Sequence, residues 1–122
     1  MDRQSIIQLC EGYNIEEYTI NDDGSIDVDD HVSFMNLGLT ELPLKFNKVS
    51  GDFYCSKNKL TTLKGSPIEV GEIFNCSYNE LTSLEFAPQS VGEDFKCSDN
   101  NLTDLKGCPK FIRGDFFCSI NN

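Results

Sequence analysis

A spacing of 21 residues recurs through most of this chain and restricts the folds that it can adopt. Seven columns of residues keep that spacing. Their members are Phe53, Phe74, Phe95 and Phe116; Cys55, Cys76, Cys97 and Cys118; Asn58, Asn79, Asn100 and Asn121; Leu60, Leu81 and Leu102; Leu63, Leu84 and Leu105; Pro67, Pro88 and Pro109; and Val70, Val91 and Ile112. Agreement of so many columns at one period predicts a solenoid, in which each repeat buries its apolar face against its neighbours.

The repeat unit reads Phe-x-Cys-x-x-Asn-x-Leu-x-x-Leu, as in residues 53–63. Phenylalanine and cysteine two positions apart lie on one face of a short strand, so we expect both to point into the stack. The asparagine is expected to turn inward and bond backbone groups of neighbouring turns as a ladder. The leucines fill the space beneath the return loop, which is too short for a full helix and is expected to be irregular or 3₁₀-like.

The first quarter of the chain is expected to cover the first edge of this stack. Residues 2–9 are predicted to form a short helix, and residues 18–20 and 26–28 a hairpin around the turn at residues 21–24. Residues 30–49 read as a degenerate first repeat, with Leu37 in place of the ladder asparagine. We therefore expect one domain over residues 1–122, with a cap (1–29), the degenerate repeat (30–49) and the 21-residue repeats (50–122), of which the last is incomplete.

The sequence stops just after the strand of the last repeat, at Asn122. Stacked strands leave unpaired backbone groups and apolar surface at an open edge. Either the chain is a piece of a longer solenoid, or this edge meets another chain. A homodimer with apposed C-terminal edges is the preferred hypothesis.

The repeat resembles the leucine-rich repeat, L-x-L-x-x-N-x-L, with phenylalanine and cysteine in its first two apolar positions. Residues 18–28, 39–49 and 51–56 are similar to small leucine-rich-repeat proteins of tailed bacteriophages, and the resemblance extends over roughly residues 15–122. It implies an α/β-poor, leucine-rich-repeat-like solenoid of short parallel strands with an irregular or 3₁₀ convex side. It also implies a phage-encoded protein that binds a host or defence component inside an infected bacterium, and it supplies no catalytic residue.

The charge of the chain is negative and uneven. The formal net charge is −10, and residues 1–30 hold nine acids and a single base. Direct binding of nucleic acid phosphates and docking on an anionic membrane both need clustered Lys and Arg, so neither is expected. No stretch approaches the roughly 20 apolar residues of a membrane span, and the first residues lack the pattern of a secretory signal. We expect a soluble protein of the host cytoplasm.

Six cysteines raise the question of metal or disulfide chemistry. The repeat cysteines lie in one inward column with about 4.8 Å between strands, and a line of thiols cannot surround one zinc ion. Parallel side-chain directions also suit disulfides poorly. We expect these cysteines to be small buried hydrophobic residues. Cys108 falls in a position for small residues, and Cys10 ends the predicted helix.

The remaining candidates for chemistry are His31 and the acidic stretch of residues 21–30. His31 is the single histidine, and we expect it at the surface, away from the inward-facing Cys55. The acidic stretch departs from the spacing of an EF-hand calcium loop and lacks flanking helices, so a solvated hairpin is favoured over a calcium site. No catalytic constellation or phosphate loop is present. We expect no enzyme, no cofactor and no metal site.

The working surface is expected on the concave side, formed by residues between and beside the inward Phe and Cys. The serines there are constant, whereas the other positions vary from repeat to repeat, which is typical of recognition. The partner-binding residues predicted on this face are Asp52, Tyr54, Lys57, Asn75, Tyr78, Lys96, Asp99 and Phe117. Exposed aromatic residues anchor protein interfaces, although the same residues can simply pack across strands.

Two function classes follow. The first is a non-catalytic interaction module that inhibits or redirects a bacterial host or defence protein. The second is an acidic decoy that imitates nucleic acid and occupies a basic binding site. The decoy requires the N-terminal acids, namely Asp22, Asp23, Asp27, Asp29 and Asp30. We rank it second because most of the charge lies in one segment, and a purely structural repeat protein is a third alternative.

Overall fold

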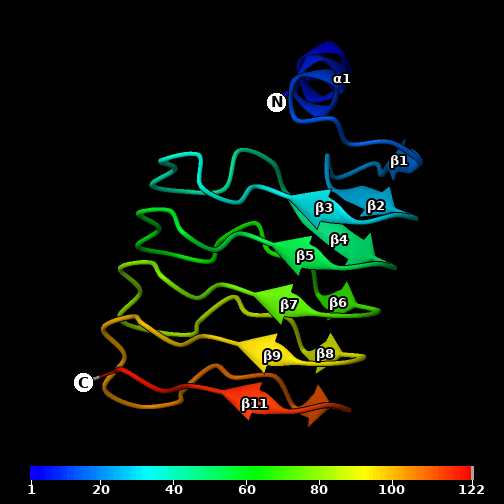
Figure 1. The fold of residues 1–122 in the computed structure, drawn as a ribbon. Coiled ribbons are helices and arrows are strands. Elements are labelled where there is room, and N and C mark those ends of the chain that lie inside the picture. The colour runs from blue at the N-terminus through cyan, green and yellow to red at the C-terminus, as the bar shows by residue number, and fades with distance from the viewer. Residues whose placement is uncertain (122) are drawn as a thin grey trace.

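The computed structural model describes residues 1–121, which form a β-solenoid of about four turns under an N-terminal helix and hairpin (Figure 1). This confirms the predicted stack of short parallel strands and its cap. The elements are α1 (Arg3–Gly12), β1 (Tyr18–Ile20), β2 (Ile26–Val28), β3 (Val32–Ser33), β4 (Phe46–Val49), β5 (Phe53–Tyr54), β6 (Glu69–Val70), β7 (Phe74–Asn75), β8 (Ser90–Val91), β9 (Phe95–Lys96), β10 (Phe111–Ile112) and β11 (Phe116–Phe117). The return loops are irregular, with no 3₁₀ helix among residues 1–121.

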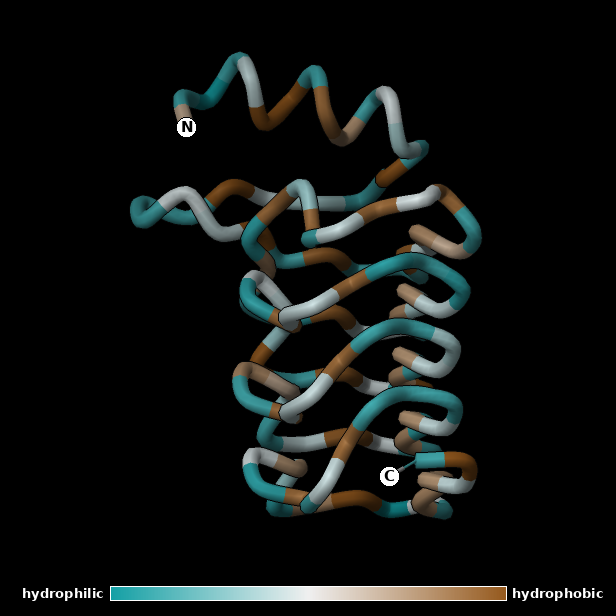
Figure 2. The backbone as a smooth tube through the Cα atoms, turned by 90° about the vertical axis from the view of Figure 1, so that its left-hand side faces the viewer, coloured by the Kyte–Doolittle hydropathy of each residue, from teal (hydrophilic) through white to brown (hydrophobic). Residues whose placement is uncertain are grey.

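Each turn of the solenoid contributes two strands, which lie in two different sheets. One sheet has the strand order β1-β2-β4-β6-β8-β10, and the other has the order β3-β5-β7-β9-β11. Strand β1 pairs antiparallel with β2, and the other pairings are parallel. Hydrophobic segments of successive turns therefore lie above one another (Figure 2).

The sheet that contains the valine column is a feature that the repeat pattern did not predict. The sequence indicated one strand in each turn, at the Phe-x-Cys positions, and none at the valine column. Strands β6 and β8 are two residues long, and each buries one valine, Val70 or Val91. A single apolar residue shows no alternation, so such a strand cannot be recognised from its period.

A column of phenylalanine rings forms the centre of the core. Phe53, Phe74 and Phe95 are fully buried. The ring centroids of Phe53 and Phe74 are 5.6 Å apart at an interplanar angle of 8°, and those of Phe74 and Phe95 are 5.5 Å apart at 7°. Pairs of this kind contribute about 0.5–1.5 kcal/mol each beyond the area that they bury. The parallel register, which pairs Phe53 with Phe74 and Phe74 with Phe95, keeps the rings aligned.

The predicted asparagine ladder is present. The Asn79 amide nitrogen donates hydrogen bonds to the carbonyl oxygens of Cys55 and Cys76, each at 3.0 Å, and its Oδ1 accepts the Leu60 N–H at 2.9 Å. The residue before Asn79, Tyr78, has a φ of 58°. A left-handed backbone is costly for a residue with a side chain. Here it turns the chain so that the asparagine reaches inward.

Helix α1 and the β1–β2 hairpin form the N-terminal cap, which covers the first turn of the solenoid (Figure 1). Helix α1 begins one residue later than predicted, because the Asp2 side chain caps it by accepting the Ser5 N–H at 2.8 Å, and it ends three residues later, at Gly12. Ile6 and Cys10 are buried, so Cys10 belongs to the core rather than merely ending the helix. The β1–β2 hairpin is confirmed.

The predicted degenerate repeat forms the first turn. Strand β3 pairs with β5 in the expected register, with Val32 opposite Phe53. Leu37, which replaces the ladder asparagine, is half exposed. Its N–H is bonded by the next turn, through Asn58 Oδ1 at 2.9 Å. The ladder therefore extends one turn towards the N-terminus from Asn58, the first asparagine of the pattern.

The last turn exposes residues whose equivalents are buried above it. Leu105 is 47% exposed, whereas Leu84, one repeat earlier, is fully buried. Phe111 and Ile120, whose equivalents in the turn above are the polar residues Ser90 and Asp99, add exposed apolar surface, and β10 and β11 end their sheets. The expected open apolar edge is therefore present in the described residues.

Replacing Asn79 by alanine tests the ladder. The Leu60 N–H is bonded by Asn79 Oδ1, and a buried group left without a partner costs roughly 1–3 kcal/mol. We expect the free energy of unfolding, measured by urea denaturation, to fall by at least that amount. Asn101→Ala, which changes an exposed asparagine whose side chain makes no hydrogen bond within residues 1–121, is the control and should change it by less than about 0.5 kcal/mol. A fall in the free energy of unfolding of less than about 0.5 kcal/mol for Asn79→Ala would contradict the ladder.

Candidate functional site

The outer side of the sheet β3-β5-β7-β9-β11, here called the sheet face, carries a different residue in each turn. The outward position of each strand holds Ser33, Tyr54, Asn75, Lys96 and Phe117 in succession. Tyr54, Asn75 and Lys96 are partly buried, and Phe117 is 42% exposed. The Lys96 Nζ lies 5.4 Å from the centroid of the Phe117 ring, which is a cation–π contact. The turns descend in a straight line in Figure 1, so the sheet face is one flank of a straight stack.

Three predicted binding residues lie beside the strands rather than within them. Lys57, Tyr78 and Asp99 occupy the left-handed position before each ladder asparagine, with φ of 58°, 58° and 57°. Tyr78 is 55% exposed, Lys57 is exposed, and Asp99 is partly buried. They form a second column next to the sheet face. Each residue of this column adopts the left-handed backbone that turns the next residue, the ladder asparagine, inward. The ladder therefore fixes where these side chains leave the backbone.

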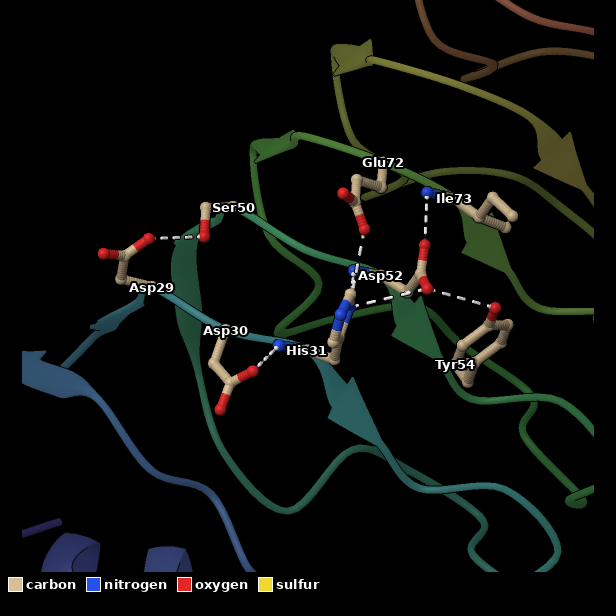
Figure 3. Close-up of polar contacts among 8 residues, drawn as sticks. All are labelled: Asp29, Asp30, His31, Ser50, Asp52, Tyr54, Glu72 and Ile73. Atoms are coloured by element: carbon tan, nitrogen blue, oxygen red, sulfur yellow. Dashed lines mark hydrogen bonds and ion pairs between the residues drawn. The ribbon is translucent and has the colours of Figure 1, made fainter.

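A polar cluster lies at the start of the sheet face, where the chain enters β3, β5 and β7 (Figure 3). His31 Nδ1 is 3.4 Å from Asp52 Oδ2 and 3.5 Å from Glu72 Oε1. The same nitrogen accepts the backbone N–H of Asp52 at 2.8 Å. Asp52 is predicted as a binding residue, but its two partners are not: His31 was expected only at the surface, and Glu72 was not singled out.

The repeat register and one glycine create this cluster. Positions 31 and 52 are 21 residues apart, so they fall in the same column of successive turns. A Cβ on Gly51 would lie 2.5 Å from His31 Nδ1, and the imidazole therefore occupies space that any other residue would fill. The spacing of 21 residues between His31 and Asp52 indicates in the sequence that they are neighbours. Catalytic motifs do not reveal this, because they join residues within one repeat rather than across repeats.

Asp52 has two structural partners in addition to His31. Its Oδ1 accepts the Ile73 N–H at 2.9 Å. The equivalent contact two repeats below, from the Asp115 N–H to Asp94 Oδ1, has the same distance. Its Oδ2 accepts the Tyr54 hydroxyl at 3.3 Å. Burial, and after it the negative charge of Asp52, raises the pKa of Tyr54 above its usual range.

The predicted acidic patch is distributed over local contacts. Asp23 accepts the N–H and hydroxyl of Ser25 and pairs with Lys45, and these bonds, those from Ser25 foremost, lower its pKa to about 2. The other contacts are Asp27 Oδ1 with Asn47 Nδ2 at 2.9 Å, Asp29 Oδ1 with Ser50 Oγ at 2.7 Å, and Asp30 Oδ1 with the His31 N–H at 2.8 Å. Asp22 is exposed. Most of these acids thus attach the hairpin and its continuation to the first turns.

The thiols do not form a reactive group. All six cysteines are free, and Cys55, Cys76 and Cys97 are fully buried. Burial raises the pKa of Cys55 and Cys76 well above the usual range, and that of Cys97 to about 12. Neutral buried thiols behave as small hydrophobic side chains. Cys118 is exposed and Cys108 is partly buried.

An apolar groove of about 630 Å³ lies on the return loops, away from the sheet face. Its lining includes Pro43, Pro67, Ile68 and Phe86, and Ile68 and Phe86 are exposed. Phe86 has a φ of 73° at the position that Gly65 occupies one repeat earlier. Sequence reasoning did not find this groove, because Phe86 lies outside the repeated columns.

Replacing Asp52 by asparagine tests the contact with Tyr54. We expect the pKa of Tyr54 to fall, because the carboxylate charge that opposes phenolate formation is lost, while burial keeps it above the usual range. Absorbance at 295 nm, compared with the same variant in a Tyr54→Phe background, isolates the Tyr54 titration. Asp94→Asn is the control and should leave the pKa of Tyr54 unchanged. An unchanged Tyr54 titration in the Asp52→Asn variant would contradict the contact.

Comparison with models of protein families, with curated proteins and with solved structures gives no match to this chain. Within residues 1–121, the helix is neither long nor apolar enough to cross a membrane. What the protein does is therefore inferred from its own residues, chiefly those of the sheet face.

Proposed function

We propose that this protein is a non-catalytic interaction module that binds another protein through the sheet face. The proposal rests on one observation: in the strands of the sheet face, the inward residues are constant and the outward residues vary. The inward positions repeat the same phenylalanine and cysteine, whereas the outward positions change from Tyr54 to Asn75, Lys96 and Phe117. A repeated core with a varied outer surface is how solenoids present binding surfaces.

The chemistry of the face fits a protein partner. Tyr78 and Phe117 are large apolar side chains that the fold leaves about half exposed. Aromatic residues of this kind supply most of the binding energy in many interfaces, and polar residues surround them. Lys57, Lys96 and Asp99 provide that polar surround. The short strands and the ladder hold these side chains in place before binding, which lowers the entropy cost of association.

The resemblance of the repeat to small phage leucine-rich-repeat proteins supports a more specific proposal. The partner is then a bacterial host or defence protein, which this protein meets in the host cytoplasm and inhibits or redirects. The acidic decoy is the alternative. Asp23, Asp27 and Asp29 already bond within the chain, and these local roles favour the interaction module. Pairing of two copies through the C-terminal edge is a separate proposal that sedimentation tests.

The double variant Tyr54→Ala, Tyr78→Ala tests the interaction module. The first step is to identify by mass spectrometry the dominant protein that copurifies with the wild-type chain at low and at moderate salt. We expect the double variant to bind that purified protein at least about tenfold more weakly, since two anchoring aromatics are removed. Circular dichroism should remain that of the wild type.

The control for this experiment is Phe111→Ala, which removes an exposed aromatic from the other sheet and should bind as the wild type does. Equal affinity of the double variant and the wild type would reject the sheet face as the binding surface. Capture of basic nucleic-acid-binding proteins that wash off with salt would instead favour the acidic decoy.

A further inference from the structure

We propose that His31, Asp52 and Glu72 bind a divalent transition-metal ion, with Zn²⁺ the representative case. Each residue offers one ligand atom, and the three atoms lie within 4.8 Å of one another. Figure 3 shows the three side chains converging at the edge of the sheet face. Among residues 1–121, this is the one group of three such side chains with this geometry. No metal site was expected from the sequence, in which only the cysteines and the acidic hairpin offered candidate ligands.

The electrostatics of the cluster favour a cation. His31 Nδ1 accepts the Asp52 N–H, so in this geometry it carries no hydrogen, and the ring hydrogen is on Nε2. The three neighbouring atoms are therefore an unprotonated nitrogen and two carboxylate oxygens. In the described part of the chain, Asp52 and Glu72 have no ion pair with a lysine or arginine. A positive ion between the three atoms removes their mutual repulsion.

Two of the three distances between the ligand atoms match a tetrahedral ion, and the carboxylate oxygens of Asp52 and Glu72 lie within 4.8 Å of each other. Zinc lies about 2.0–2.2 Å from histidine nitrogen and carboxylate oxygen, so two ligand atoms of a tetrahedral site are about 3.3–3.5 Å apart. The Nδ1 atom is 3.4 Å from Asp52 Oδ2 and 3.5 Å from Glu72 Oε1. Binding requires the imidazole ring to rotate, so that the Nδ1 lone pair turns from the Asp52 N–H to the ion. The amide of Asp52 thus loses a hydrogen bond when metal binds.

The ligands are held by the fold rather than gathered by chance from long side chains. Three successive turns supply one ligand each, and Gly51 leaves the space that the imidazole occupies. Asp52 is oriented by the Ile73 N–H and the Tyr54 hydroxyl. Bonds of this kind to a ligating carboxylate set its direction and strengthen metal binding.

The donor set selects the class of metal. Calcium and magnesium prefer oxygen ligands alone, whereas an imidazole with carboxylates suits zinc, cobalt and related ions. The side chains of His31, Asp52 and Glu72 are 59%, 20% and 41% exposed. One side of the site is therefore open, and water can complete the coordination. Binding of the ion requires no protein partner.

Titration of the metal-free, untagged chain with Zn²⁺ by calorimetry, and with Co²⁺ by visible absorption, tests the site. We expect one saturable ion per chain, with weaker binding at acid pH because protons compete for the ligands. His31→Ala and Glu72→Gln should each weaken binding at least about tenfold. In ¹⁵N NMR spectra, the Asp52 amide should shift strongly when the diamagnetic Zn²⁺ is added.

Two control variants identify the binding residues. Glu93→Gln changes the equivalent glutamate one repeat below Glu72, and Cys118→Ser removes the exposed thiol; both should bind as the wild type does. The proposal is overturned if no saturable binding occurs, if His31→Ala and Glu72→Gln bind normally, or if Cys118→Ser abolishes binding. It is also overturned if the Zn²⁺-dependent shifts lie outside residues 30–32, 51–54 and 71–73.

Discussion

The hydrogen bonds of the asparagine ladder are the interaction on which the rest of this structure depends. Most repeat strands of the solenoid are two residues long, so sheet pairing alone leaves many backbone groups of each turn without a partner. Buried backbone groups must be bonded. One asparagine per turn bonds carbonyl groups of its own turn and of the turn before it, and it accepts an N–H from that preceding turn.

The ladder also explains why the period is kept so strictly. An asparagine shifted by one residue would point its amide away from the carbonyl groups that it bonds, and the inward phenylalanines would move to the other face. A constant period places residues 21 apart in one column. The chain can therefore vary outward positions while the ladder and the inward columns stay the same, as it does on the sheet face and at His31.

Much of the fold was predictable because it follows from the 21-residue repeat. The inward Phe and Cys, the ladder, the degenerate first turn and the hairpin all follow from spacing and turn chemistry. The second sheet was not predictable, because strands such as Glu69–Val70 carry one apolar residue each. The burial of Cys10 was not predictable, because the packing of helix α1 on the first turn is a tertiary property that a helix pattern does not contain.

The candidate site was only partly predictable. The outward residues of the strands follow from alternation, but the left-handed backbone at Lys57, Tyr78 and Asp99 does not, because lysine and tyrosine at two of these positions rarely adopt it. The partners of His31 come from two later turns, 21 and 41 residues away. Motif searches look for ligands at short spacing, so this cluster became visible only when the turns were stacked.

Amide hydrogen exchange at Leu60 and Leu81, followed by NMR, tests the central role of the ladder most directly. Each of these N–H groups is bonded by an asparagine side chain of the next turn, Leu60 by Asn79 and Leu81 by Asn100. If the ladder holds the stack, both amides exchange only through global unfolding, with protection that matches the free energy of unfolding. Exchange as fast as that of the exposed loop amide of Thr82 would contradict the account.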